Sequence, residues 1–217
     1  MEQQIIEVKA LNMQFMDVNI HSLTPIIFNK FSRKSLELML KTQTLTKAEI
    51  KLLKAKPRVW NEESKVEDAT DKLHMTEDNV IGFPIIGIAA SISCDAPNMG
   101  LFKKDVNSAM KFYNQDLSMD GEIIAVFEYN NKDIHLRVDR VRLSNGSTSA
   151  TARYMLMKWS TTLKIGFDAN ILSAESVINL INNAGTHIGI GSWRPYVERG
   201  SGKPGIFGQY AVVNKPI

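Results

Sequence analysis

The stretch RYMLMKWSTTLKIGF, residues 153–167, has the most regular hydrophobic pattern of the chain. One face would carry Met155, Met157, Trp159, Leu163, Ile165 and Phe167, and the other Tyr154, Lys158, Ser160, Thr162 and Lys164. This period of two residues indicates a β-strand, because successive side chains of a strand point to opposite faces. The stretch therefore predicts one long strand that is buried on one side.

Two further strands are predicted just upstream. Residues 123–129 and 134–143 flank an Asn-Asn pair, and Asn tolerates the positive φ that a two-residue hairpin turn requires. In the second strand the apolar phase changes near Asp139, which predicts a β-bulge there. The bulge would leave one polar face, made of His135, Arg137, Arg140 and Arg142.

The N-terminal part predicts one strand and two capped helices. Imperfect alternation favours a strand over residues 11–23. Ser32 is placed to cap a helix, and Thr46 with Glu49 makes a capping box for a helix over residues 47–56. The first helix would have an apolar stripe of Leu36, Leu38, Met39 and Leu40.

The middle of the chain predicts an acidic helical insertion at about residues 57–78. Beyond it, Pro84 stands just before the apolar run IIGIAASISC, which predicts a buried helix entered through a proline. Residues 103–113 predict a further short helix.

In the C-terminal part, Ser173 would cap a helix that ends at Gly185, and residues 186–191 and 207–213 predict two strands. The resulting order of elements is typical of an α+β domain whose antiparallel sheet has helices on one face. We therefore predict a single ferredoxin-like or RNA-recognition-motif-like (RRM-like) domain over residues 1–217.

Composition limits the function further. The 217 residues are 44% hydrophobic and 23% charged, as in ordinary globular proteins. The longest uncharged stretch, residues 80–94, is too short to span a bilayer, and the N-terminus lacks the apolar core of a secretory signal. The single cysteine, Cys94, excludes an intrachain disulfide. We expect an intracellular protein without a membrane partner.

The charge is unevenly distributed. Residues 132–217 hold 11 Lys or Arg against 5 Asp or Glu, whereas the whole chain has a net charge of only +3. A basic surplus in one part of a fold favours an anionic partner, of which nucleic acid is the commonest. The alternative at this stage is a solvated basic face without a ligand.

Patterns for catalysis are weak. The four histidines do not form a metal-binding pair. Residues 200–205 match G-x-G-x-x-G, but Pro204 prevents the helix that a dinucleotide site needs after its glycines. We expect no enzyme activity, no catalytic residue, no metal and no cofactor. A metal-dependent nuclease that uses Asp139 or Asp168 is the third hypothesis.

The strongest local signal is the glycine-rich segment that begins GTHIGIGSWRP at residue 185. Glycines allow close approach of another chain, while aromatic and basic side chains offer stacking surfaces and phosphate partners. In this segment those side chains are Trp193, Arg194, Tyr196, Arg199 and Lys203. The alternative is a loop that closes over the core with Trp193 packed inside.

These residues carry a family resemblance. The run AGTHIGIGSWRP, the later GIFGQY and the upstream TPIIFNKFS and GFP segments resemble a family of uncharacterised tailed-phage proteins with a G-x-G-x-W-R-P loop. More distantly, the layout is similar to the RAMP superfamily, the RNA-binding backbone subunits of CRISPR effector complexes. Family members commonly carry an acidic residue where this chain has Ser192. The resemblance implies a phage-encoded, RAMP-like nucleic-acid-binding protein in the cytoplasm of the infected bacterium.

The sequence hypothesis is therefore a homo-oligomeric protein that binds single-stranded RNA or DNA, with RNA favoured. The expected binding residues are Arg137, Arg140, Arg142, Tyr154, Lys158, Lys164, Trp193, Arg194, Tyr196, Arg199 and Lys203. The alternative is a phage protein that binds another protein, or counters host defence, through its acidic insertion.

Overall fold

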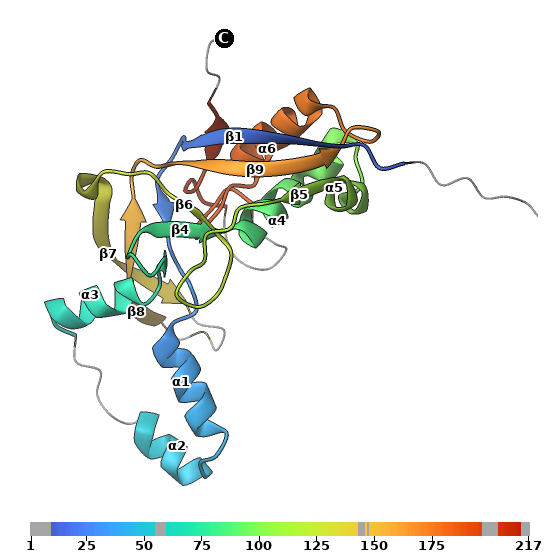
Figure 1. Ribbon diagram of the computed structural model, residues 1–217. Coiled ribbons are helices and arrows are strands. Elements are labelled where there is room, and N and C mark those ends of the chain that lie inside the picture. Colours follow the sequence, from blue (N-terminus) through green and yellow to red (C-terminus); the bar gives the residue numbers. More distant parts are fainter. Residues whose placement is uncertain (1–9, 55–59, 143–145, 147, 197–203, 214–217) are drawn as a thin grey trace, which may run out of the picture.

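The computed structural model describes residues 10–54, 60–142, 146, 148–196 and 204–213. Within these residues it contains six α-helices and ten strands, arranged as three antiparallel sheets. The prediction of an α+β fold with antiparallel sheets is confirmed. Figure 1 shows a compact body from which α1 and α2 protrude.

The four-stranded sheet, called sheet A, has the order β10-β1-β9-β5. Its strands are β1 (Met13–Ser22), β5 (Met110–Phe112), β9 (Ser160–Asp168) and β10 (Tyr210–Val212). β1 and β9 pair along nine residues, from Met13 opposite Asp168 to His21 opposite Ser160. The predicted strand over residues 11–23 is confirmed. Val18, Ile20, Leu163, Ile165 and Phe167 point from these two strands into the core.

Two helices cover the inner face of sheet A. They are α4 (Ile85–Asp95), which starts after Pro84, and α6 (Ala174–His187), whose N-cap Ser173 accepts a hydrogen bond from the Ser176 N–H. Both starts are as predicted. In Figure 1, α6 lies behind β1 and β9. Between the layers, the buried Tyr210 hydroxyl lies 2.7 Å from the Ser91 hydroxyl, and burial raises the pKa of Tyr210.

A second sheet, called sheet B, has the order β2-β8-β7. Its strands are β2 (Ile26–Ile27), β7 (Ile134–Arg142) and β8 (Thr148–Leu156). Beyond the short β2, the edge of β8 is completed by α3 (Glu62–Thr70). The Ala152 N–H donates to Asp68 Oδ2 at 2.9 Å, and Lys72 Nζ donates to the Ala152 carbonyl at 2.9 Å. Two side chains thus replace a strand neighbour.

The remaining elements connect these layers. A third sheet has the order β3-β4-β6, with β3 (His74–Met75), β4 (Ile81–Pro84) and β6 (Ile124–Val126). Short connections are η1 (Ala96–Met99), α5 (Lys103–Ala109) and η2 (Asn131–Asp133). The protruding helices are α1 (Arg33–Thr42) and α2 (Lys47–Lys54). Their predicted capping residues are correct, because the Ser35 N–H donates to Ser32 Oγ and Glu49 Oε2 accepts from the Thr46 N–H.

The prediction of one long strand over residues 153–167 is wrong. β8 ends at Leu156, and β9 begins at Ser160 in a different sheet. Between them Trp159 enters the core and stacks on Phe127, with ring centroids 4.5 Å apart. The buried phase also changes, because Leu156 is buried whereas Met157 is exposed. The hydrophobic alternation of the sequence continues through residues 157–159, although the chain passes there from sheet B to sheet A.

The predicted hairpin and bulge are also wrong. β6 pairs with β4, whereas β7 pairs with β8, so residues 123–129 and 134–143 are not hairpin partners. β7 keeps a one-to-one register with β8 along its whole length, without a bulge. Its apolar pattern is misleading because Val138 is exposed while Asp139 is buried against arginines.

Two predictions further along need correction. Residues 186–191 are not a strand: α6 continues to His187 and an irregular loop follows. Gly185 therefore lies inside α6, where a Cβ would come within 2.0 Å of the Tyr210 carbonyl oxygen. The helix predicted over residues 103–113 ends at Ala109, and its last part is β5.

Candidate nucleic-acid interface

The outer face of sheet A, called the open face, is exposed to solvent. Alternation in β1, β5 and β9 sends the side chains between the core residues to this side. Opposite positions on it are Phe15 with Gly166, Asp17 with Lys164, and Lys111 with Gly166. Phe15, Asp17, Lys111, Tyr113 and Lys164 are all exposed. None of the described elements covers this face, so its aromatic and basic side chains are available to a ligand.

Two aromatic rings form the centre of the open face. Phe15 is 68% exposed and Tyr113 is 45% exposed, and their ring centroids lie 5.3 Å apart in an edge-to-face arrangement. Gly166 makes room for both rings: a Cβ there would lie 2.6 Å from a Tyr113 ring carbon and 3.0 Å from a Phe15 ring carbon. The glycine therefore lets the rings sit low on the sheet with their outer surfaces free.

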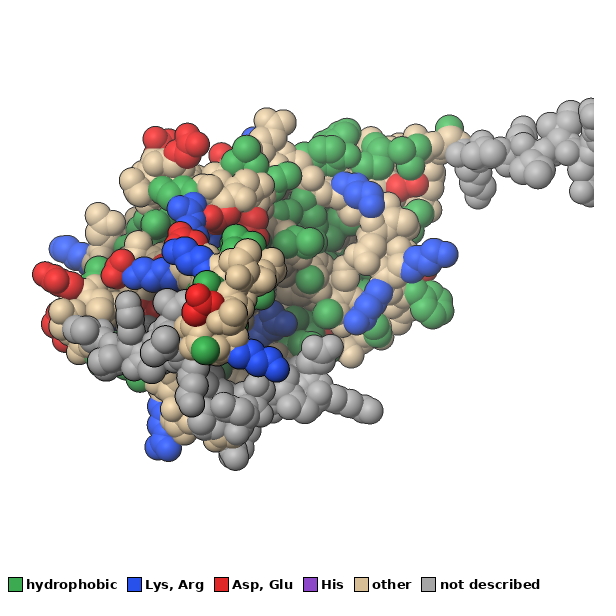
Figure 2. Space-filling view, turned by 90° about the horizontal axis from the view of Figure 1, so that it is seen from below, with side chains coloured by type: hydrophobic (Ala, Val, Ile, Leu, Met, Phe, Trp, Pro, Cys, Tyr) green, Lys and Arg blue, Asp and Glu red, His purple; other side chains and the backbone are tan. Residues whose placement is uncertain are grey.

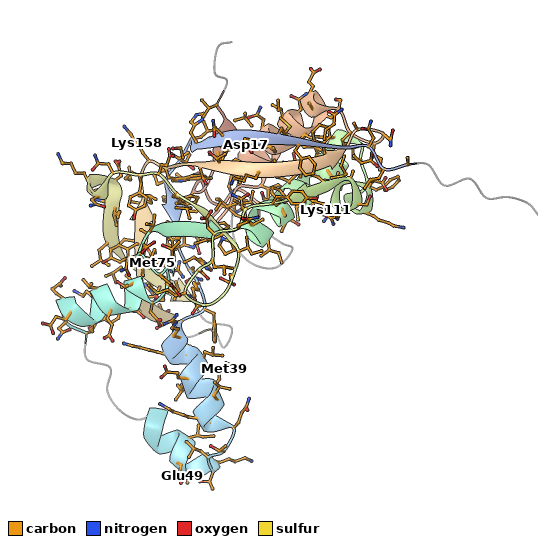
Figure 3. The ribbon with its side chains drawn as sticks, viewed as in Figure 1. Asp17, Met39, Glu49, Met75, Lys111 and Lys158 are labelled. Atoms are coloured by element: carbon orange, nitrogen blue, oxygen red, sulfur yellow. The ribbon has the colours of Figure 1, made fainter. Side chains whose placement is uncertain are left out.

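Polar groups surround the rings. Lys111 comes from β5 and Lys164 from β9, while Asp17 faces Lys164 from β1. Figure 3 labels Asp17 on β1 and Lys111 on β5. The edge of β9 is completed by Asn114, whose Nδ2 donates to the Thr162 carbonyl at 3.0 Å and whose Oδ1 accepts from the Lys164 N–H at 3.0 Å. These two hydrogen bonds fix the backbone of β9 from Thr162 to Lys164.

A second aromatic and basic group, called the Arg–Trp cluster, lies on sheet B. It consists of Arg137, Asp139, Arg153, Trp193 and Phe207. The Arg137 guanidinium lies 5.0 Å from the Trp193 ring centroid and 5.3 Å from the Phe207 ring centroid. The Arg153 guanidinium lies 5.8 Å from the Trp193 ring. These distances are typical of cation–π contacts.

Most of the charges of the cluster are paired within it. Arg137 Nε and Nη2 each lie 2.8 Å from Asp139 Oδ1, and Arg153 Nη1 lies 3.8 Å from Asp139 Oδ2. Arg153 is only 7% exposed, and burial lowers the pKa of its guanidinium, an effect that Asp139 partly offsets. Arg153 Nε and Asp139 Oδ2 are buried without a hydrogen-bond partner, so charge pairing and ring contacts, rather than hydrogen bonds alone, hold Arg153 in place. Through these contacts the cluster links the glycine-rich loop to sheet B.

Close backbone contacts hold the glycine-rich loop in place. Trp193 has a positive φ of 54°, and its carbonyl accepts from the Phe207 N–H at 3.1 Å. A Cβ at Gly205 would lie 1.7 Å from the Trp193 carbonyl oxygen, so this position requires glycine. The Trp193 side chain itself is 41% exposed, and the alternative that packed it inside the core is wrong.

A polar groove adjoins the cluster. It has a volume of about 530 Å³ and lies between α1, the end of α3 and β8. Arg153, Lys72, Asp68 and Lys34 are among its lining residues. Lys72 and Asp68 already bond to β8, as described above, and Lys34 Nζ lies 2.6 Å from Glu67 Oε1. The charged side chains that line this groove are therefore paired within the protein.

The structure does not bring the predicted site residues together. Without the bulge, Arg137 and Arg140 point to opposite faces of β7, so the single predicted polar face is wrong. Tyr154 is half-buried, Arg194 is half-buried, and Tyr196 is exposed. Figure 3 shows Lys158 far from Lys111. The Arg142 side chain, Arg199 and Lys203 lie outside the residues that the structure describes.

Sequence reasoning missed most of the open face. Of the predicted residues only Lys164 lies on it, while Phe15, Lys111 and Tyr113 were not proposed. The alternation over residues 11–23 did place Phe15 on a strand. Tyr113 was hidden because residues 103–113 resemble a helix.

Other kinds of site find little support. Among the residues that the structure describes, no three His, Cys, Asp or Glu side chains are grouped as metal ligands. No helix within the described ranges is long and apolar enough to cross a membrane. Comparisons with models of protein families and with curated proteins give no match.

Proposed function

We propose that this protein binds single-stranded nucleic acid, RNA ahead of DNA, on the open face of sheet A. The observation that carries the proposal is the exposed Phe15–Tyr113 pair seated over Gly166. Bases of single strands stack on exposed aromatic rings, and each such contact contributes about 1 to 3 kcal/mol. Lys111 and Lys164 lie on the same face of the sheet as the rings and are exposed, so they can meet phosphates.

Polar side chains extend the same face. Thr162 Oγ1 donates to Asn19 Oδ1 at 2.6 Å, and these two residues are directly opposite on β9 and β1. Hydroxyl and amide groups of this kind can contact the 2′-hydroxyl that distinguishes RNA from DNA. This arrangement favours RNA within the proposal.

The topology supports the proposal independently. Along the chain, sheet A and its helices follow the order β1, α4, β5, β9, α6, β10, and both helices lie on one side. This is the βαββαβ order of ferredoxin-like and RRM-like folds. We propose that sheet B and the β3-β4-β6 sheet are additions to such a core. In RRM domains the uncovered sheet face stacks bases on aromatic side chains.

The likeness of the GIGSWRP loop to tailed-phage proteins adds a biological setting to the proposal. It favours a virus-encoded protein that acts in the cytoplasm of the infected cell.

The decisive experiment is a binding titration of fluorescent single-stranded oligonucleotides, RNA and DNA of the same sequence, followed by anisotropy. The double variant Phe15→Ala/Tyr113→Ala should weaken binding at least tenfold and leave the circular-dichroism spectrum unchanged. The matched control is Ile86→Ala, which removes an exposed apolar side chain from α4 instead. Equal affinity of the double variant and the parent would refute this site.

One observation favours a second function, binding of a protein through the acidic insertion. A groove of about 690 Å³ runs along α3 and is lined by Glu62, Glu63, Glu67 and Asp71 around Val66. Val66 is 44% exposed. An apolar side chain among carboxylates suits a basic amphipathic segment.

A further inference from the structure

The protruding α1–α2 hairpin, residues 33–54, exposes apolar side chains. All ten residues of α1 are described, and none of them is buried. Leu36, Met39 and Leu40 follow the i, i+3, i+4 spacing of an amphipathic helix, and each is exposed. Figure 3 shows Met39 on α1 and Glu49 on α2 well away from the body of the protein. Such a stripe normally covers a neighbouring element, and this one faces solvent.

The hairpin and α3 have opposite charges. Residues 33–54 contain six Lys or Arg and two Glu, a net charge of +4. Residues 62–71 contain five Asp or Glu and one Lys, a net charge of −4. Figure 2, which looks from the side of the protruding helices, shows acidic and basic side chains together on the left half, where α1, α2 and α3 lie. Complementary charge of this size specifies and orients partners.

The groove along α3, called the α3 groove, already holds a hairpin residue at one end. Lys34 lines it and forms an ion pair with Glu67, at 2.6 Å. The rest of the hairpin cannot use the groove of its own chain in this arrangement, because α1 leads away from α3 and α2 lies at the far end (Figure 1). A hairpin from another molecule meets no such restriction.

We propose that the α3 groove of one copy receives the α1–α2 hairpin of a second copy. Lysines of the hairpin, such as Lys41 and Lys47, would meet Glu63 and the exposed carboxylates of Glu62 and Glu67, while the apolar stripe would cover Val66. Glu62 and Glu67 already pair with Lys65 and Lys34 of their own chain, but both carboxylates remain mostly exposed. The two surfaces differ, so the contact is head-to-tail and leaves one free hairpin and one free groove at the ends. Contacts of this kind build open chains rather than closed dimers.

The test measures mass by sedimentation velocity without nucleic acid, so its outcome is independent of the proposed nucleic-acid site. At low salt the mass of the parent should rise with concentration, and at high salt it should return to that of one chain, because screening weakens exposed charge pairs. A parent that stays monomeric at low salt over the whole concentration range overturns the proposal.

Two variants make the test specific. Lys41→Glu/Lys47→Glu brings the hairpin from +4 to 0, and Glu63→Lys/Glu67→Lys brings residues 62–71 from −4 to 0. Each variant alone should remain monomeric. An equimolar mixture should form a complex of two chains and no larger particle, because only one hairpin and one groove still match. Pairing in the mixture also shows that both variants are folded. A mixture that stays monomeric, or a single variant that assembles like the parent, contradicts the head-to-tail contact.

Discussion

The open face of sheet A and the Arg–Trp cluster on sheet B contain similar aromatic and basic side chains, but those of the open face are exposed, whereas those of the cluster contact one another. On the open face, Phe15 and Tyr113 contact each other, and Lys111 and Lys164 are both exposed, with Lys111 Nζ donating to the Asn107 carbonyl at 2.5 Å. In the cluster, Arg137 stacks on Trp193 and is held by Asp139. Aromatic and basic residues can therefore form a ligand surface or a structural fastening, depending on whether their partners lie within the protein.

The difference follows from burial. Arg153 is 7% exposed, so its charge must be compensated inside the protein, and Asp139 supplies the compensation. Phe15 is 68% exposed, so its ring has no partner in the protein on its outer surface and a base can replace the water there. We infer that the cluster provides stability, whereas the open face of sheet A is the proposed binding surface.

The largest expected effect comes from breaking the cluster. Asp139→Ala should lower the free energy of unfolding by about 3 to 5 kcal/mol, because Arg153 would remain buried without its carboxylate. For a chain of this size the melting temperature should fall by roughly 10 °C. Thermal unfolding followed by circular dichroism measures it. Arg140→Ala is the control, since Arg140 is exposed on the same strand and should change stability by less than about 0.5 kcal/mol. Similar melting of the two variants would mean that the ion pairs contribute nothing.

A smaller loss is expected from Trp193→Ala. The substitution removes two cation–π contacts, each worth about 0.5 to 1 kcal/mol, so stability should fall by about 1 to 2 kcal/mol. Nucleic-acid affinity should change less than twofold. If instead nucleic-acid binding is lost while the melting temperature stays constant, Trp193 is a stacking residue. The Arg–Trp cluster, rather than the open face of sheet A, would then be the binding surface.

Local signals in the sequence predicted the helix starts well. Ser32, Thr46 and Ser173 were identified as capping residues because a cap depends only on neighbours within three or four positions. The buried helix after Pro84 was equally local, since its apolar run stands out from the sequence around it.

Pairing between strands was not predictable in the same way. Alternation over residues 153–167 is real, but it does not say which sheet a strand joins, and Trp159 marks a crossing from sheet B to sheet A. The Phe15–Tyr113 pair needs two strands that come together only through β9. Likewise Asp139 is buried because Arg137 and Arg153 lie beside it, which no local pattern encodes.

Gly166→Ala tests the geometry of the open face without removing a ring. The added methyl group would lie 2.6 Å from Tyr113, so the rings must move apart or tilt. Affinity should fall about three- to tenfold, a part of the 1 to 3 kcal/mol that a stacked base contributes. The same anisotropy titration measures it, with Ile86→Ala on α4 again as the control. Unchanged affinity would show that the ring arrangement is incidental.

The smallest expected effect is electrostatic and concerns Lys111 and Lys164. Each phosphate contact on a single strand contributes about −0.7 to the slope of log affinity against log salt. Lys111→Gln and Lys164→Gln should therefore each make the slope shallower by about 0.7, and the double variant by about 1.4. At high salt the affinities should approach that of the parent, because the stacking of bases on Phe15 and Tyr113 does not depend on these charges. Arg140→Gln carries the same loss of charge on sheet B and should leave the slope unchanged. If Arg140→Gln flattens the slope and the lysine variants do not, the nucleic acid follows sheet B, and the exposed rings of sheet A serve another partner.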